Sequence, residues 1–146
     1  MIRPKLMAVL APLALLACAG NAVAATLAVT KTASCGCCAK WVEHLKKAGF
    51  NVTVRNVEDV TPTAQRLGVP GKLRSCHTAE IDGYAIEGHV PVADIKRLLA
   101  ERPKAAGIAV PGMVMGSPGM EHGDHKEPYQ TILFDKAGNT RVFASH

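Results

Sequence analysis

Three cysteines in four residues, Cys35-Gly36-Cys37-Cys38, lie where the chain changes from a strand pattern to a helix pattern. Residues 26–30 form a short β-branched run that predicts a strand. From residue 37 or 38 to 48 the apolar residues recur at helical spacing, and Gly49 ends the pattern. A helix N-terminus stabilises negative charge and lowers the pKa of a nearby thiol. The cysteine cluster is therefore placed to supply reactive thiolates.

The chain after this cluster has the pattern of one α/β domain. Residues 51–57 alternate valine with polar residues and predict a second strand. Because a helix connects it to the first strand, we expect a parallel, right-handed βαβ unit. The pattern further predicts a short helix with Thr61 as N-cap and Pro62 at its first position. It also predicts a strand within residues 76–87, an amphipathic helix over 91–101, and a hairpin of residues 130–134 and 140–143.

The first 24 residues are typical of a secretory signal peptide. Arg3 and Lys5 precede an apolar run over residues 6–19, and Ala22-Val23-Ala24 is a small-residue cleavage site. The apolar run is too short for a good membrane span, and no later segment is long and apolar enough. We therefore expect a mature, exported domain of residues 25–146. The alternative is a lipoprotein in which Cys18 carries the lipid.

Export has consequences for charge and for cysteine chemistry. Loss of two positive charges lowers the formal net charge from +5 to +3, and with aromatic residues at 4% and scattered charges, nucleic-acid binding has little support. We expect a periplasmic monomer. In an oxidising compartment its four cysteines would form disulfides unless a metal or a reductant protects them. These four are Cys35, Cys37, Cys38 and Cys76.

The cysteine cluster is compatible with two chemistries. Cys35 and Cys38 have the C-x-x-C spacing of dithiol redox sites, which makes them the candidate catalytic pair. Cys37 is an extra thiol that such a motif does not need. Soft thiolates select Cu(I) or zinc, and a thiolate can bridge two metal ions, so the cluster also predicts a metal site that holds more than one copper. A plain structural disulfide is the remaining alternative.

Two further groups supply candidate metal ligands. Cys76 and His77 are a Cys-His pair and candidate ligands. The alternative is that Cys76 is a core residue and His77 is solvated. Residues 109–124 contain three glycines by residue 119 and two prolines, and predict a loop with thioether and imidazole ligands that suit copper in both oxidation states. The alternative is a loop that buries its methionines in the core. His89, before a predicted helix, suggests a local hydrogen-bonding role. The candidate loop ligands are Met113, Met115, Met120, His122 and His125.

The sequence resembles the exported copper-resistance family called CopG, which is marked by its CxCC motif. The resemblance runs in order from about residue 26 to 121, nearly the whole predicted mature chain. It covers the cluster with Trp41, His44-Leu45 and Gly49-Phe50, then Gly68-Val69-Pro70, Ser75-Cys76-His77-Thr78-Ala79, Gly83-Tyr84, Glu87-Gly88-His89-Val90-Pro91, Val110-Pro111-Gly112-Met113 and Gly116-Ser117-Pro118-Gly119-Met120-Glu121.

The resemblance implies a thioredoxin-like domain with a C-terminal extension, from about residue 109, that helps to bind metal. It also implies copper held by cysteine sulfurs, in a multinuclear cluster, and a role in copper tolerance through interconversion of Cu(I) and Cu(II). Thioredoxin-like domains usually place a cis-proline opposite the cysteines, and Val110-Pro111 is the candidate for it.

The predicted function is a periplasmic copper-binding protein that acts as a copper oxidoreductase, with periplasmic copper-export or redox proteins as partners. Two alternatives stay open: a metal-free thiol–disulfide oxidoreductase, and a passive copper carrier or buffer that uses the same ligands. A structural zinc site suits the adjacent cysteines and the methionines poorly.

Overall fold

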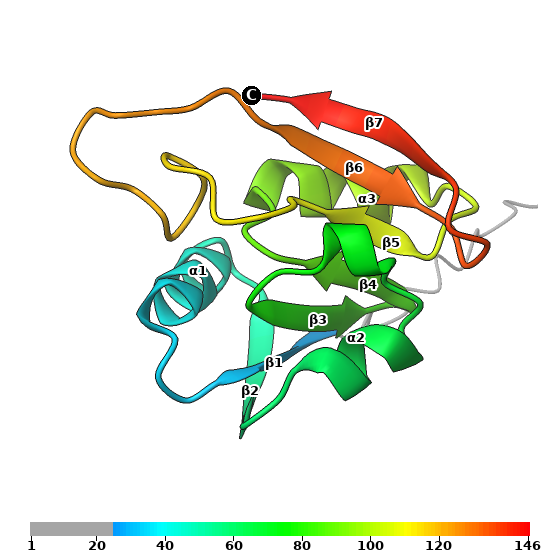
Figure 1. The fold of residues 1–146 in the computed structure, drawn as a ribbon, viewed down its shortest axis with the longest axis horizontal. Coiled ribbons are helices and arrows are strands. Elements are labelled where there is room, and N and C mark those ends of the chain that lie inside the picture. The colour runs from blue at the N-terminus through cyan, green and yellow to red at the C-terminus, as the bar shows by residue number, and fades with distance from the viewer. Residues whose placement is uncertain (1–24) are drawn as a thin grey trace, which may run out of the picture.

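The structure, a computed structural model, describes residues 25–146 and builds them around a seven-stranded mixed sheet (Figure 1). The strands lie in the order β2-β1-β3-β4-β5-β6-β7. The elements are β1 (Thr26–Thr32), α1 (Gly36–Lys47), β2 (Asn51–Val57), α2 (Thr61–Arg66), the 3-10 turn η1 (Gly71–Leu73), β3 (His77–Ile81), β4 (Tyr84–Glu87), α3 (Val92–Glu101), β5 (Gly107–Ala109), β6 (Gln130–Phe134) and β7 (Thr140–Ser145).

The predicted β1-α1-β2 unit is present, and its two strands are parallel, with Thr26 opposite Asn51. The helix begins one residue after Cys35, so the cysteine motif forms its cap and its first turn. Trp41, Val42 and Leu45 are buried beneath the helix, as the apolar spacing predicted. This packing fixes the N-terminal end of α1, and with it the cluster, above the end of β1.

The segment predicted to contain one strand forms two. β3 and β4 pair antiparallel, and Asp82 and Gly83 turn between them with φ of 49° and 82°. β3 also pairs antiparallel with β1. The short helix α2 is present, but Thr61 is not its N-cap. Val60 occupies that position, and the Thr61 N–H instead donates to Asp59 Oδ1 at 2.8 Å.

Strand β5 has only three residues, and the sequence pattern did not predict it. It lies parallel to β4, and Gly107 faces Ala85 so closely that a Cβ on Gly107 would be 2.0 Å from the Ala85 carbonyl oxygen. β5 connects the first half of the sheet to the predicted C-terminal hairpin, β6 and β7, which is present.

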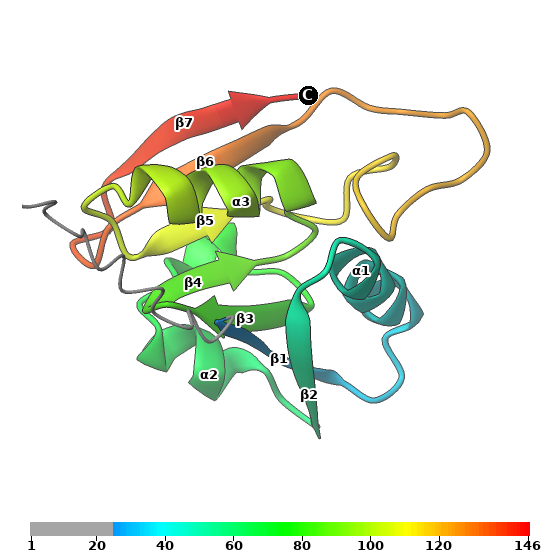
Figure 2. The same cartoon turned by 180° about the vertical axis from the view of Figure 1, so that it is seen from behind.

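The core has two parts, one on each face of the sheet. The larger cluster joins Trp41 and Leu45 of α1 to Ile95 and Leu98 of α3. The smaller one packs Ala64 of α2 against Phe134 of β6. Figures 1 and 2 show α2 and α3 on opposite faces of the sheet. The predicted class, a single mixed α/β domain with a long loop and a C-terminal hairpin, is confirmed, while the thioredoxin-like label stays a prediction.

Between β5 and β6 the chain leaves the sheet as a long segment without helix, residues 110–129, which passes over α1 (Figure 2). We call it the Met/His loop. The prediction of a cis bond at Val110-Pro111 is wrong, because no peptide bond in residues 25–146 is cis. The predicted signal peptide and Cys18 lie outside the described residues. Within the described part of the chain, no helix has the length and apolar character needed to span a membrane.

Candidate metal centre

The N-terminus of α1 places the three clustered cysteines. Cys35 is the N-cap residue, with extended backbone angles, and its Sγ accepts a hydrogen bond from the Cys38 N–H at 3.3 Å. Cys37 and Cys38 follow in the first turn. Cys38 is wholly buried, whereas Cys35 and Cys37 are half-buried. The helix therefore presents one sulfur toward the core and two toward the surface, beside its unpaired N–H groups.

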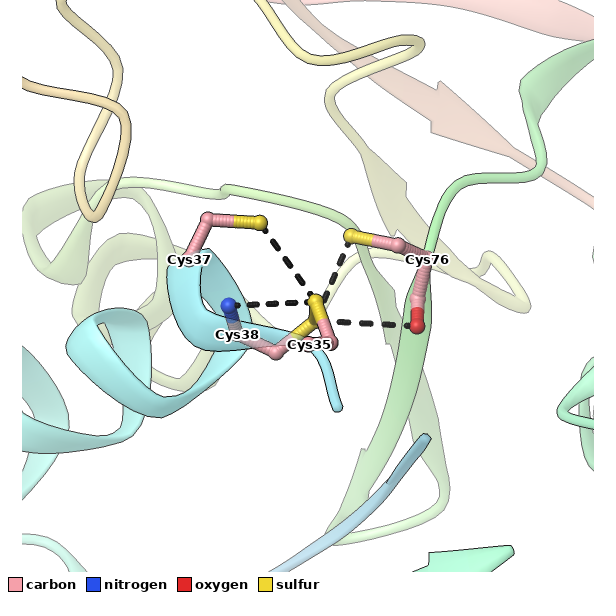
Figure 3. A group of neighbouring side chains, drawn as sticks. All are labelled: Cys35, Cys37, Cys38 and Cys76. Carbon is pink, nitrogen blue, oxygen red and sulfur yellow. Dashed lines mark hydrogen bonds between the residues drawn. A yellow bond between two sulfur atoms is a disulfide. The ribbon is translucent and has the colours of Figure 1, made fainter. Parts of the chain in front are cut away.

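A fourth sulfur, from Cys76, completes the cluster across 38 residues of sequence. Cys35 and Cys38 form a disulfide, and Cys37 and Cys76 are free thiols. Cys37 Sγ lies 3.4 Å from Cys35 Sγ, and Cys76 Sγ lies 3.3 Å from Cys38 Sγ. All four sulfur atoms lie within 4.8 Å of one another (Figure 3). The structure thus brings together all four cysteines that the sequence selected.

Cys76 also belongs to a second group of potential ligands, with His77 and His89. The Cys76 Sγ atom lies 3.5 Å from His77 Nδ1 and 3.6 Å from His89 Nε2. The three ligand atoms lie within 4.8 Å of one another. Cys76 is therefore the residue common to a four-sulfur group and a mixed sulfur–imidazole group.

Both imidazoles are buried among aromatic rings. The ring of His77 lies 4.4 Å from that of Trp41 and 4.9 Å from that of His89, centroid to centroid. Burial lowers the pKa of His77 to about 3, and it also lowers the pKa of His89. Both rings are therefore neutral at neutral pH, the form that binds metals. The His77 Nε2 atom is buried without a hydrogen-bond partner.

His89 is the site residue that the sequence reasoning missed. Its predicted hydrogen-bonding role is present, since the Nδ1–H group donates to the Pro118 carbonyl oxygen at 2.8 Å. The same bond leaves the Nε2 lone pair free on the side of Cys76, as in histidines held for metal binding. The pairing of β3 with β4 could have identified His89 as a neighbour of Cys76. With Thr78 opposite Glu87, the register continued outward places residue 76 opposite residue 89.

Glu87 of β4 holds two residues close to Cys76 in the sequence, Ser75 and Thr78. Glu87 is wholly buried, and it accepts hydrogen bonds from the Ser75 N–H at 2.6 Å and the Thr78 hydroxyl at 2.5 Å. Burial raises the pKa of Glu87 to about 7. Burial, followed by the neighbouring Cys37, raises the pKa of Cys76 to about 11. Without a metal, Cys76 is therefore a thiol rather than a thiolate.

The Met/His loop is fastened to the cluster at several points. Gly119 packs against the first turn of α1, where a Cβ would lie 2.7 Å from the Cys37 carbonyl oxygen. His44 of α1 pairs with Glu121 at 2.7 Å. The Ser75 hydroxyl donates to the Gly112 carbonyl at 3.0 Å. These contacts hold the loop over the site.

The proposed ligands of the loop are not gathered as the cysteines are. Met113 is 58% exposed, and Met115 and Met120 are half-buried. His122 and His125 are exposed and bridge each other through their backbones. Within residues 25–146, neither histidine belongs to a group of three or more histidine, cysteine, aspartate or glutamate ligands. The role of all five loop residues as metal ligands stays a prediction.

The fold and the site define a class: a mixed α/β protein in which a C-x-x-C helix, the Cys76-His77 pair and His89 bring together a compact group of soft potential ligands. Two solved structures match it, titled "Copper resistance protein copG", Form 2 and Form 1. Form 2 is 46% identical, with a TM-score of 0.79, over 84% of this chain and 98% of that one. Form 1 has the same identity and TM-score, and the match covers 83% of this chain and 96% of that one. The chain belongs to the CopG copper-resistance family.

The other two comparisons add less. Residues 73–120, which include Cys76, His77, His89 and all the methionines of the loop, match the family described as "Protein of unknown function, DUF411". The comparison with curated proteins gave no match.

Proposed function

We propose that this chain is an exported copper-binding protein of copper resistance, and that its cysteine cluster both binds copper and exchanges electrons with it. One observation carries the proposal: four cysteine sulfurs lie within 4.8 Å of one another, and two of them form a disulfide. One compact group thus offers soft ligands and a two-electron couple.

Copper is the metal that fits the donors best. Thiolate sulfur selects Cu(I), and neutral imidazole also suits Cu(II). Cys76 stands between both kinds of donor, with His77 and His89 within 3.6 Å of its sulfur. The relatives at 46% identity are titled copper resistance proteins. The four sulfurs are numerous and close enough to bridge several Cu(I) ions, which supports a multinuclear site.

The electron balance follows from the disulfide. Cys35 and Cys38, as two thiols, lose two electrons and two protons when they form the disulfide. Those electrons reduce two Cu(II) ions to two Cu(I) ions, and the protons leave to solvent. In the reverse direction, the disulfide oxidises two Cu(I) ions. Cys35 is the sulfur of the pair nearer the surface, at the positive end of α1.

The Met/His loop would supply a second ligand set above the cysteines. Its contacts with Cys37, His44 and Ser75 place it beside the cluster. A thioether and imidazole set tolerates both oxidation states of copper, so the loop would receive or release the ion that the cysteines reduce. The members of this set are Met113, Met115, Met120, His122 and His125.

We also propose that residues 1–24 are a secretory signal and that the mature chain works in the periplasm as a monomer. The basic start and the Ala22-Val23-Ala24 site support export. Lipidation of Cys18 is the alternative. Periplasmic copper-export or redox proteins would exchange copper or electrons with the chain.

An anaerobic titration tests the proposal. Fully reduced protein is titrated with Cu(I) and separately with Cu(II). We expect at least about one copper per chain, a thiolate-to-copper charge-transfer band, and loss of two thiols for every two Cu(II) ions reduced. Uptake of less than about one copper per chain, without such a band, would refute the proposal.

The disulfide at the start of α1 also favours a second function, a metal-free thiol–disulfide oxidoreductase. That protein would reduce insulin disulfides equally well after Met113, Met115 and Met120 are changed to leucine. A passive copper carrier differs in another way, because it would bind both ions without changing their oxidation state. A Cu(I)-specific chelator added after Cu(II) loading separates the carrier from the oxidoreductase.

A further inference from the structure

Two thiols remain when the disulfide has formed. Cys37 and Cys76 are free, and each is in contact with a different end of the bond between Cys35 and Cys38. Cys37 Sγ lies 3.4 Å from Cys35 Sγ, and Cys76 Sγ lies 3.3 Å from Cys38 Sγ. Figure 3 shows the sulfur atoms of Cys37 and Cys76 pointing toward each other, from α1 and from the segment before β3. The oxidised cluster therefore still has two thiols that are able to bind a metal ion.

The spacing of the two free sulfurs suits a single ion between them. They lie within 4.8 Å of each other. A soft metal–sulfur bond is about 2.3 Å long, taking zinc–thiolate bonds as the guide, so an ion midway between two sulfurs needs them about 4.6 Å apart. The upper limit of 4.8 Å on the separation of the two sulfurs includes this value, so Cys37 and Cys76 are close enough to bind one ion together.

The surroundings of the two sulfurs favour Cu(I) over harder ions. Cys76 is half-buried, and its other neighbours are the neutral imidazoles of His77 and His89. No carboxylate belongs to either group of potential ligands at this site. The donors within reach are thus sulfur and imidazole nitrogen, which suit a soft monovalent ion.

We propose that the disulfide form of this protein retains a Cu(I) site, formed by the thiolates of Cys37 and Cys76. The inference rests on the proposed function and divides the cluster by role. Cys35 and Cys38 supply electrons, and Cys37 and Cys76 hold a product ion. Each disulfide formed yields two Cu(I) ions, of which this site keeps one. The other leaves the cysteines, toward the Met/His loop or an acceptor.

The test begins with protein in which the Cys35–Cys38 disulfide has been formed and located by peptide mass spectrometry. Cu(I) is added anaerobically as its acetonitrile complex. We expect about one Cu(I) per chain. Bound Cu(I) should also protect Cys37 and Cys76 from iodoacetamide. Each of the variants Cys37→Ser and Cys76→Ser, oxidised in the same way, should lose the ion.

A second variant keeps the test independent of disulfide formation. Cys35→Ser with Cys38→Ser removes the redox pair and leaves the two proposed ligands, so it should still bind about one Cu(I). If oxidised protein takes up no Cu(I), or if Cys37→Ser retains it, the inference is wrong. A disulfide found at Cys38–Cys76 would also overturn it.

Reduced wild-type protein, titrated in parallel, separates this inference from the proposed function. If the reduced protein binds copper and reduces Cu(II) while the oxidised protein stays empty, only the retained site is refuted. If the reduced protein neither binds nor reduces copper, the proposed function itself fails. If the oxidised protein binds Cu(I) but the reduced protein leaves Cu(II) unchanged, the retained site stands and the electron exchange is refuted.

Discussion

The Nδ1–H group of His89 donates a hydrogen bond to the carbonyl oxygen of Pro118 at 2.8 Å, and this bond connects the sheet to the Met/His loop. The other ring nitrogen lies 3.6 Å from Cys76 Sγ. One buried imidazole thus contacts both the Cys76 sulfur and the backbone of the Met/His loop. It can fix the loop, bind the metal, or do both, and the two roles predict different results.

Two substitutions of His89 separate these roles. Glutamine retains an N–H donor for Pro118 but has no imidazole, whereas alanine has neither. If His89 is a ligand or orients Cys76, both variants should bind copper about 10- to 100-fold more weakly, the range found for groups that support a metal site. Only His89→Ala should also make the Met/His loop more sensitive to limited proteolysis. Unchanged copper affinity in His89→Gln would show that the imidazole is not needed for binding.

Gly119 tests whether the loop must lie against the helix. Both Gly119 and Gly123 have positive φ, 89° and 56°, but only Gly119 is crowded. Its added Cβ would lie 2.7 Å from the Cys37 carbonyl oxygen and 2.9 Å from the Trp41 nitrogen, and both are backbone atoms that cannot move aside.

The matched variants are Gly119→Ala and Gly123→Ala. Each should lose about 1 kcal/mol of unfolding free energy through backbone strain alone. Gly119→Ala should in addition push the loop away from α1 and weaken copper binding. The measurements are thermal unfolding and copper titration. Equal copper affinity in the two variants would mean that the close packing of the loop on Cys37 does not serve the site.

The sequence predicted those parts of the fold whose residues are periodic over several turns or strand pairs. The β1-α1-β2 unit and the β6-β7 hairpin are of this kind. β5 could not be predicted in this way, because three residues are too few to show a periodic pattern of apolar side chains. Its position depends on the close approach of Gly107 to Ala85, which is a tertiary contact. The predicted N-cap at Thr61 failed because Asp59 takes the Thr61 N–H instead.

The candidate site was predictable in its ligand types and only partly in its geometry. The CxCC motif and Cys76 could be selected because clustered soft donors that follow a predicted signal peptide are informative. The distance between them depends on β1 pairing with β3, which no local pattern shows. His89 was missed because it needed the register of the β3-β4 hairpin. The cis bond at Val110-Pro111 was inferred from resemblance alone, and it is absent.

The methionines offer a test of the second ligand set that leaves the fold intact. Changing Met113, Met115 and Met120 to leucine roughly conserves volume, and such changes usually cost less than about 1.5 kcal/mol each. Thermal stability of the metal-free protein and alkylation of its thiols should therefore change little. Copper affinity should fall, because three thioether sulfurs are lost. The measurement is competition with a Cu(I) chelator, and an unchanged affinity would remove the methionines from the ligand set.

Glu87 makes the stability of the metal-free protein depend on pH. Burial raises its pKa from 4.5 to about 7 in the folded state. Between these two values the folded protein keeps a proton that the unfolded chain releases. The contribution of Glu87 to stability should therefore fall by an amount on the order of 3 kcal/mol as pH rises from about 4.5 to 7, and stay level above that. His77, whose pKa burial lowers from 6.5 to about 3, acts in the opposite direction below pH 6.5, so the Glu87 contribution is measured against a variant that lacks it.

Glu87→Gln tests this linkage directly. The amide has nearly the same shape and can still accept the Ser75 N–H bond, but it has no charge to bury. Denaturant unfolding in the presence of a chelator gives the change in unfolding free energy from pH 5 to pH 7.5. This change should be more positive for the variant than for the wild type, because the variant lacks the loss that Glu87 causes. Glu43→Gln, at an exposed position on α1, is the control and should keep the wild-type difference. If Glu87→Gln keeps it too, the buried carboxyl is not the group that couples folding to pH, and its hydrogen bonds to Ser75 and Thr78 outweigh the cost of burying its charge.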